Sequence, residues 1–181
     1  MSTKAARRYA NAFLEIAIEQ DTLEKAREDM LLIKNTIGAS DELRLFLKNP
    51  IVKKDQKKKA VEAIFKDKVQ DITLQLYELL SKKDRESLFE DISKNFIELY
   101  NRHKGIIEVS VTSANKLEKA QLEALRKSIE QTTGKKVEFK TEVDEELIGG
   151  LKYRIDDTVV DGSVKFKLNQ LKHRLTSTAV E

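Results

Sequence analysis

Apolar residues in the first hundred positions of the chain recur every three or four residues, which is the spacing of amphipathic helices. The pattern predicts about six helices. The expected segments are about 3–20, 22–38, 40–48, a fourth around 61–65, 69–80 and 84–102. Ser40 and Asp84 stand where the third and sixth would be capped, and Asn49-Pro50 stops the third. We therefore expect a six-helix bundle in the N-terminal part.

Past residue 105 the pattern changes to the alternation of apolar and polar residues that is typical of half-buried strands. The segments expected to be strands are 106–111, 137–143, 151–155 and the short 159–160. Helical spacing returns over about 116–131, and again after Ser163, which stands where the last helix would be capped. A small α/β domain is therefore expected to follow the bundle.

The placement of glycine marks the same boundary. The first 104 residues hold one of the six glycines, Gly38, together with the only proline, and the other five glycines follow from Gly105 onward. Strands joined by tight turns need glycine for positive φ angles, whereas helical bundles can do with few. We expect an α+β protein of two domains, residues 1–105 and 106–181.

Composition narrows the class of protein. Charged residues make up 36% of the 181 residues and hydrophobic residues 40%, with a formal net charge of +3. This mixture predicts a solvated surface around a buried core, and the small net charge does not by itself indicate nucleic-acid binding. The absence of cysteine excludes disulfides and thiolate metal sites. No apolar run approaches the ~20 residues of a membrane-spanning helix, so we expect a mature cytoplasmic protein without membrane insertion.

Candidate catalytic residues are few, and each has a structural explanation. His103 and His173 fall late in expected helices beside an arginine, where a cation suits the helix dipole. The carboxylates of Asp144 and Asp161 could serve a small hydrolase, but their positions in turns favour solvated or capping roles. Gly134 follows a helix and opens a strand, the reverse of a phosphate-binding loop. We therefore expect no enzyme activity, no metal site and no cofactor.

The strongest basic feature is the segment 53–59, in which five of the seven residues are lysine. It could contact phosphates, as in a nucleic-acid adaptor, or an anionic membrane surface. The segment has no interleaved aromatic residues and begins a helix that is apolar on one side only, which favours an ordinary solvated helical face. Binding that weakens steeply with salt would identify the adaptor.

Two of the expected helices, 3–20 and 69–80, are apolar around most of their circumference. A helix with little polar surface must be buried on more than one side. Either both helices are central to the bundle, or they frame a groove for a partner's amphipathic helix, with Tyr9 and Phe13 as anchors. Periodicity alone does not decide between these readings. The apolar stripe of the last helix also allows two interpretations, internal packing or a docking surface, and internal packing is favoured.

Three stretches of the sequence carry a family resemblance. They are Ala6-Arg7-Arg8-Tyr9-Ala10 near the start, Leu79-Leu80 followed by Arg85, Ile92 and Phe96 in the middle, and Ile148-Gly149-Gly150-Leu151 followed by Asp161-Gly162-Ser163-Val164 near the end. The last stretch, beside a helical N-terminal domain, is the most specific. Over nearly its whole length the chain resembles the delta subunit of the F-type ATP synthase, whose mitochondrial counterpart is the oligomycin sensitivity conferral protein.

The resemblance implies a non-catalytic stator subunit. Such a subunit links the catalytic head to the peripheral stalk, so that rotation of the central shaft is coupled to ATP synthesis and ion transport. In this family the N-terminal bundle holds the amphipathic N-terminal helix of an alpha subunit, in a groove between its first and fifth helices. Carried onto this sequence, the residues of that groove are Tyr9, Ala12, Phe13, Leu76, Leu79 and Leu80.

The resemblance also implies a role for the C-terminal domain, which is expected to meet the b subunits of the peripheral stalk. There the residues expected to set structural turns are Gly149, Gly150, Asp161, Gly162 and Ser163. No nucleic acid and no small-molecule substrate is implied. The expected place is the cytoplasmic face of a bacterial plasma membrane, reached peripherally through the ATP synthase complex.

Overall fold

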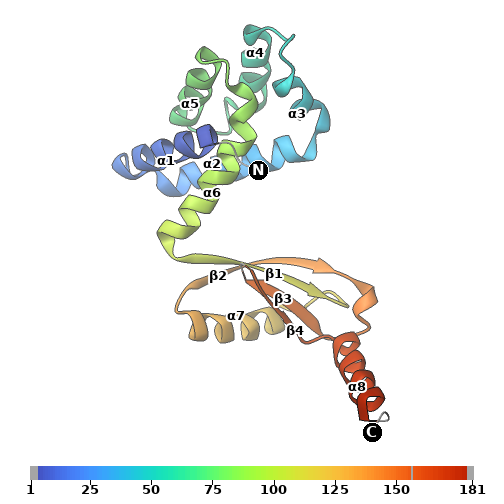
Figure 1. The fold of residues 1–181 in the computed structure, drawn as a ribbon. Coiled ribbons are helices and arrows are strands. Elements are labelled where there is room, and N and C mark those ends of the chain that lie inside the picture. Colours follow the sequence, from blue (N-terminus) through green and yellow to red (C-terminus); the bar gives the residue numbers. More distant parts are fainter. Residues whose placement is uncertain (1–3, 156, 179–181) are drawn as a thin grey trace. The chain divides into compact units, whose positions relative to one another are not determined.

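The structure of the chain is a computed structural model that describes residues 4–155 and 157–178 (Figure 1). Backbone contacts divide the chain into two compact units, Met1–Tyr100 and Asn101–Glu181. Where it is described, the first unit holds only helices, and the second holds a four-stranded sheet with helices. The expected α+β class is therefore confirmed. Among the helices of the described ranges, none is long and apolar enough to cross a membrane.

Unit 1 is helical because its apolar residues keep a period of three to four. The described helices are α1 (Lys4–Glu19), α2 (Leu23–Ala39), α3 (Asp41–Lys48), α4 (Lys54–Phe65), α5 (Asp71–Lys82) and α6 (Phe89–Lys104), with a 3-10 turn, η1 (Glu86–Leu88), before α6. Ser40 caps α3 as expected, and its Oγ accepts a hydrogen bond from the Leu43 N–H at 3.1 Å. Helix α6 continues past the boundary between the units.

The prediction that Asp84 caps the sixth helix is wrong. Asp84 lies just beyond α5 with a φ of 56°. Its N–H donates to the Ser81 carbonyl at 3.2 Å, and the N–H of Arg85 donates to the Leu80 carbonyl at 2.9 Å. These two bonds form a Schellman ending of α5, in which aspartate takes the left-handed position that glycine usually holds. The sixth helix starts only after η1.

The core of unit 1 is aromatic and aliphatic. Its fully or almost fully buried apolar residues include Ala6, Ala10, Phe13, Ala17, Met30, Ile33, Val61, Phe65, Tyr77, Leu80, Phe89, Ile92 and Phe96. The rings of Phe13 and Phe96 have centroids 5.3 Å apart, which ties α1 to α6. The rings of Tyr77 and Phe89 lie 5.0 Å apart and tie α5 to the start of α6.

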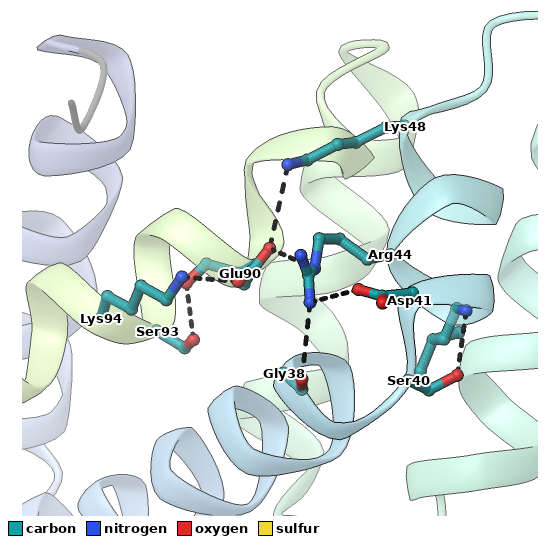
Figure 2. A network of polar contacts seen from close by, with 9 residues as sticks. Gly38, Ser40, Asp41, Arg44, Lys48, Glu90, Ser93 and Lys94 are labelled. Carbon is teal, nitrogen blue, oxygen red and sulfur yellow. Dashed lines mark hydrogen bonds and ion pairs between the residues drawn. The ribbon is translucent and has the colours of Figure 1, made fainter.

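A polar cluster holds α3 against α6 (Figure 2). At its centre is Glu90, which is only 7% exposed. Its Oε1 accepts a hydrogen bond from Lys94 at 2.5 Å, and its Oε2 lies 3.8 Å from Arg44 and 3.9 Å from Lys48. Burial alone would raise the pKa of Glu90, but the hydrogen bond and charge of Lys94, with the charges of Lys48 and Arg44, lower it below its ordinary value.

Unit 2 contains a mixed sheet. Its elements are β1 (Ile106–Ser113), α7 (Lys119–Thr133), β2 (Lys136–Val143), a 3-10 turn η2 (Glu145–Leu147), β3 (Leu151–Ile155), β4 (Thr158–Asp161) and α8 (Val164–Thr178). The strand order is β2-β1-β3-β4. Strand β1 pairs parallel with β2 and antiparallel with β3, and β3 pairs antiparallel with β4. The parallel pair needs a crossover connection, which α7 supplies.

One face of this sheet forms the core of unit 2. Val109, Val111 and Val137 point to that face, where Ile129 of α7 and the partly buried Leu125 pack against them. The alternation in β1 puts apolar residues on this face and polar ones on the other, as period-two patterning requires. The four strands and both helices of this unit lie where the sequence predicts them.

Candidate functional site

Helix α1 carries two apolar stripes. The buried stripe is Ala6, Ala10, Phe13 and Ala17, at spacings of four, three and four residues. Beside it runs a second stripe with the half-buried Tyr9, the exposed Ala12 and Ile16, whose surface is 41% exposed. The second stripe does not take part in the core of unit 1. It therefore leaves apolar surface exposed on α1.

Helix α5 has one flank on α4 and a second flank that carries apolar residues. On the α4 flank, Glu78 Oε1 accepts a hydrogen bond from Lys58 Nζ at 2.6 Å. At 100° per residue, Leu76 and Leu79 lie on the other flank. Leu76 is 8% exposed and Leu79 is 44% exposed. The flank turned away from α4 is thus apolar and partly open.

Arg85 joins α1 to the end of α5. The Schellman ending of α5 places Arg85 directly after the helix. Its Nη1 donates a hydrogen bond to the Tyr9 hydroxyl at 3.2 Å, and its guanidinium carbon lies 5.8 Å from the centroid of the Tyr9 ring. The second stripe of α1 is therefore anchored near the C-terminal end of α5. We define the α1/α5 surface as Tyr9, Ala12, Ile16, Leu76, Leu79 and Arg85.

The groove residues expected from the sequence fall into two groups. Tyr9, Ala12 and Leu79 are at least partly accessible, and Leu76 is nearly buried. Phe13 is 2% exposed and Leu80 is fully buried, so both belong to the core beneath the surface. Only Tyr9, Ala12 and Leu79 expose enough surface for direct contact, whereas the buried Leu76, Phe13 and Leu80 can act only through packing.

Sequence reasoning missed two residues of the α1/α5 surface. Ile16 lies seven residues after Tyr9, and this spacing places it on the same stripe of the helix. That signal was present in the sequence. The contact of Arg85 with Tyr9 depends on the left-handed conformation of Asp84, which no apolar periodicity indicates.

In unit 2 the turn at Gly149-Gly150 contacts the turn at Asp161-Gly162-Ser163. Gly150 has a φ of 77°, and a Cβ at this position would lie 2.6 Å from the Gly162 carbonyl oxygen. The Gly162 N–H donates to the Leu151 carbonyl at 3.0 Å. The Val164 N–H donates to the Gly149 carbonyl at 2.9 Å. The start of β3 and the start of α8 are therefore fastened together through backbone.

Asp161 and Ser163 complete this junction. The Asp161 Oδ1 accepts from the Ser163 N–H at 2.9 Å, and Ser163 Oγ accepts from the Phe166 N–H at 3.1 Å, which caps α8. Hydrogen bonds from the side chain and then the backbone of Ser163 hold the pKa of Asp161 below its ordinary value. The carboxylate of Asp161 is thus committed to a turn rather than free for proton transfer.

Asp144, the other candidate carboxylate, also stabilises a turn. Asp144 Oδ1 accepts from the Glu146 N–H at 3.1 Å at the start of η2. In the ranges that the structure describes, no group of three or more His, Cys, Asp or Glu residues is placed to hold a metal ion. His103 lies in the last turn of α6 beside Arg102, while the side chain of His173 is outside the described residues.

Unit 2 also exposes apolar residues on its last helix. Val164, Leu168 and Leu171 recur at spacings of four and three on α8, and their exposed fractions are 39%, 52% and 54%. On β4, Val159 and Val160 are 58% and 42% exposed. This apolar stripe lies outside the core of unit 2. From the sequence, this stripe of α8 could serve either internal packing or docking, and packing was favoured. In the described part of α8 the stripe is exposed.

Comparison with known proteins gives one consistent result. The family model described as ATP synthase delta (OSCP) subunit matches residues 5–175. The ATP synthase subunit delta of Chlorobaculum tepidum is 40% identical over 176 residues, which cover 97% of each chain. That of Desulforamulus reducens is 38% identical over 172 residues, 95% of each chain.

A solved structure shows a similar fold at lower sequence identity. A chain in the cryo-EM structure of the Toxoplasma gondii mitochondrial ATP synthase hexamer matches with a TM-score of 0.72 and 21% identity. The match covers 96% of this chain and 98% of that chain. The similarity therefore extends through both units and is not limited to one of them.

Proposed function

Because this chain belongs to the ATP synthase delta (OSCP) subunit family, we propose that it holds the catalytic head of an F-type ATP synthase to the peripheral stalk through two separate surfaces. The chain is a non-catalytic component of that stalk. Its two compact units suit this role, since each can bind a different partner. In domain terms, we assign head binding to residues 1–105 and stalk binding to residues 106–181.

The head-binding end is the α1/α5 surface. In this proposal the six helices of unit 1 form a bundle, and the amphipathic N-terminal helix of an alpha subunit lies along the second stripe of α1 and the free flank of α5. The single observation that carries the assignment is the exposure of Ala12, Ile16 and Leu79 outside the core. Phe13 and Leu80 support this surface from within.

The stalk-binding end is unit 2. We assign contact with the b subunits to the open stripe of α8, whose Val164, Leu168 and Leu171 are all exposed. The junction of Gly150 with Gly162 fixes where α8 begins. Through these contacts the subunit would lie peripherally at the cytoplasmic face of a bacterial plasma membrane, held there by the complex.

The mechanical task explains why no reacting groups are needed. Rotation of the central shaft applies torque to the catalytic head, and the stator must stop the head from turning with it. A buried apolar helix supplies roughly 25 cal/mol per Å² of apolar surface removed from water, without cofactor or chemistry. The small side chain of Ala12 leaves room for the partner helix to approach the backbone of α1.

A binding experiment with the full chain tests the head-binding surface. Calorimetry and amide NMR would follow titration with a synthetic peptide of the alpha subunit's N-terminal helix. We expect one-to-one binding, with shifts concentrated at α1 and α5. Ala12→Asp should weaken binding at least tenfold, because a charge would be buried against the peptide. Leu79→Asp should do the same.

Asn11→Asp provides the matched control, since Asn11 is exposed on α1 and points well away from the second stripe. This variant should bind like the wild type. Equal loss of affinity in Asn11→Asp and Ala12→Asp would contradict the assignment of the surface. Shifts confined to other helices would contradict it as well.

A further inference from the structure

Three lysines of the 53–59 segment, Lys53, Lys54 and Lys57, line a cavity in unit 1. The cavity has a volume of about 390 Å³ and lies where the connection after α3, the start of α4 and the start of η1 meet. Its lining residues are Leu47, Lys48, Pro50, Ile51, Val52, Lys53, Lys54, Lys57, Asp84, Glu86 and Ser87. None of these residues belongs to the α1/α5 surface.

Lys57 is the unusual member of this lining. Its residue surface is only 6% exposed, although it lines the cavity. Lys58, its neighbour in the sequence, forms an ion pair with Glu78 on the α5 side. Within the described residues, by contrast, no hydrogen bond or ion pair engages the Lys57 amine. In the described part of the chain the Lys57 side chain therefore lies unpaired along the wall of the cavity, where an anion could reach it.

The acidic residues of the lining already have partners of their own. Asp84 Oδ1 lies 2.8 Å from the Lys54 amine. Glu86 is 4% exposed, and its Oε1 accepts a hydrogen bond from Ser81 at 3.2 Å. Four lysines face these two carboxylates in the lining. The cavity therefore keeps an excess of positive charge.

Helix α4 adds to this positive potential. Its N-cap residue, Lys53, makes no side-chain capping hydrogen bond. The Lys53 carbonyl accepts from the N–H groups of Gln56 and Lys57 at 3.0 and 3.2 Å, which leaves the first N–H groups, those of Lys54 and Asp55, without a cap from Lys53. The N-terminus of a helix attracts anions through these N–H groups and through the helix dipole. Lys57 stands one turn into the same helix, where its amine adds a full charge to the partial charges of the backbone.

We propose that this cavity binds a small phosphate-bearing anion, with Lys57 and the N-terminus of α4 as its main contacts. Lysine is a compact donor of positive charge that suits phosphate oxygens. The apolar Leu47, Ile51 and Val52 line the remaining wall, where a non-polar part of the ligand could lie. The volume of the cavity falls within the range of about 300–1,000 Å³ that small-ligand sites occupy.

Titration of the full chain with inorganic pyrophosphate at constant ionic strength tests this site by amide NMR. We expect saturable shifts concentrated at residues 50–57 and 84–87. Lys57→Met keeps most of the aliphatic side chain and removes the charge, and it should weaken binding at least tenfold. Lys127→Met, which removes an exposed charge from α7 in unit 2, should leave binding unchanged. Succinate at the same concentration should bind more weakly than pyrophosphate.

Several outcomes would overturn the proposal. Shifts scattered over all lysines without saturation would show only general attraction of anions, as would equal losses in Lys57→Met and Lys127→Met. Succinate binding as tightly as pyrophosphate would exclude a preference for phosphate. If thermal melting shows that Lys57→Met does not fold, Lys53→Met takes its place with an expected loss of at least threefold. The site is independent of the alpha-subunit peptide, so failure here leaves the stator assignment unchanged.

Discussion

Arg85 Nη1 donates a hydrogen bond to the hydroxyl of Tyr9 at 3.2 Å, and its guanidinium carbon lies 5.8 Å from the centroid of the same ring. The two residues are 76 positions apart in the sequence. Their contact links the first helix to the end of the fifth, next to the apolar residues that we assign to partner binding. The local geometry that permits it is the left-handed Asp84 between α5 and Arg85.

A double-mutant cycle measures this contact. We expect Tyr9→Ala and Arg85→Ala to be coupled by about 0.5–1 kcal/mol in the free energy of unfolding, because the pair is exposed and water competes for both groups. Chemical denaturation of the two single variants and the double variant gives the coupling. Additivity of the two single effects would show that the contact does not stabilise the protein.

Phe13 lies directly beneath this surface and should behave as a core residue. It is 2% exposed and packs on Phe96, so Phe13→Ala should lower the free energy of unfolding by about 3–4 kcal/mol. Ile18→Ala on the same helix is the control. Ile18 is 42% exposed, and its truncation should cost less than about 1 kcal/mol. Similar costs for the two variants would mean that α1 is oriented differently.

The contrast between Phe13 and Ala12 shows where sequence reasoning reaches its limit. Apolar residues surround most of α1, so periodicity identifies the helix but not which stripe is buried. Neighbouring residues differ by 100° around the axis, and the buried stripe is set by long-range contacts such as the one with Phe96. The strands and helices of unit 2 were easier to predict, because their period of two or 3.6 and their turn residues agree with one another.

Contacts between residues that lie far apart in the sequence could not be predicted from it either. Asp29 of α2 is buried, and its Oδ2 accepts hydrogen bonds from the Gln70 N–H at 2.9 Å and from Thr73 Oγ1 at 2.6 Å. The side chain of Gln70, the N-cap residue of α5, makes no capping bond of its own. A carboxylate from another helix thus accepts from the N–H of the N-cap residue, the bond that the side chain at N3 makes in a capping box.

Removal of this carboxylate should therefore loosen α5. We expect Asp29→Ala to cost about 2 kcal/mol, because the Thr73 hydroxyl and the N–H of Gln70, the N-cap residue of α5, lose their acceptor. Hydrogen exchange should accelerate first at the N-terminal turn of α5. Glu28→Ala, at an exposed neighbouring position, should change the free energy of unfolding by less than about 0.5 kcal/mol. Unchanged exchange in α5 would rule out the capping role.

Two glycines should respond in opposite directions to alanine. Gly150→Ala places a Cβ 2.6 Å from the Gly162 carbonyl oxygen at a φ of 77°, and we expect unit 2 to lose about 3 kcal/mol or more. Gly38 lies in α2, where a Cβ would meet nothing within 4 Å. Gly38→Ala should therefore stabilise unit 1 by about 0.5–1 kcal/mol. Residue-resolved hydrogen exchange reports on the two units separately, and faster exchange in α2 of the Gly38→Ala variant would contradict the expectation.

The ionisation of Glu90 makes the stability of unit 1 depend on pH. The net effect of its surroundings is a pKa in the folded state below the ordinary value, because Lys94, Lys48 and Arg44 together outweigh the effect of burial. At acidic pH the unfolded state then binds more protons at this group than the folded state does. The contribution of Glu90 is therefore complete above its unfolded pKa of roughly 4.3 and is lost as the pH falls through the folded pKa.

Glu90→Gln should remove this dependence. Near neutral pH we expect the variant to be less stable by about 2 kcal/mol, because three basic side chains lose a largely buried carboxylate. The difference from the wild type should shrink as the pH falls below about 4, since protonation then neutralises Glu90 in the wild type as well. Denaturation at a series of pH values measures both effects. A difference that stays constant down to pH 3 would mean that the charge of Glu90 does not hold α3 against α6.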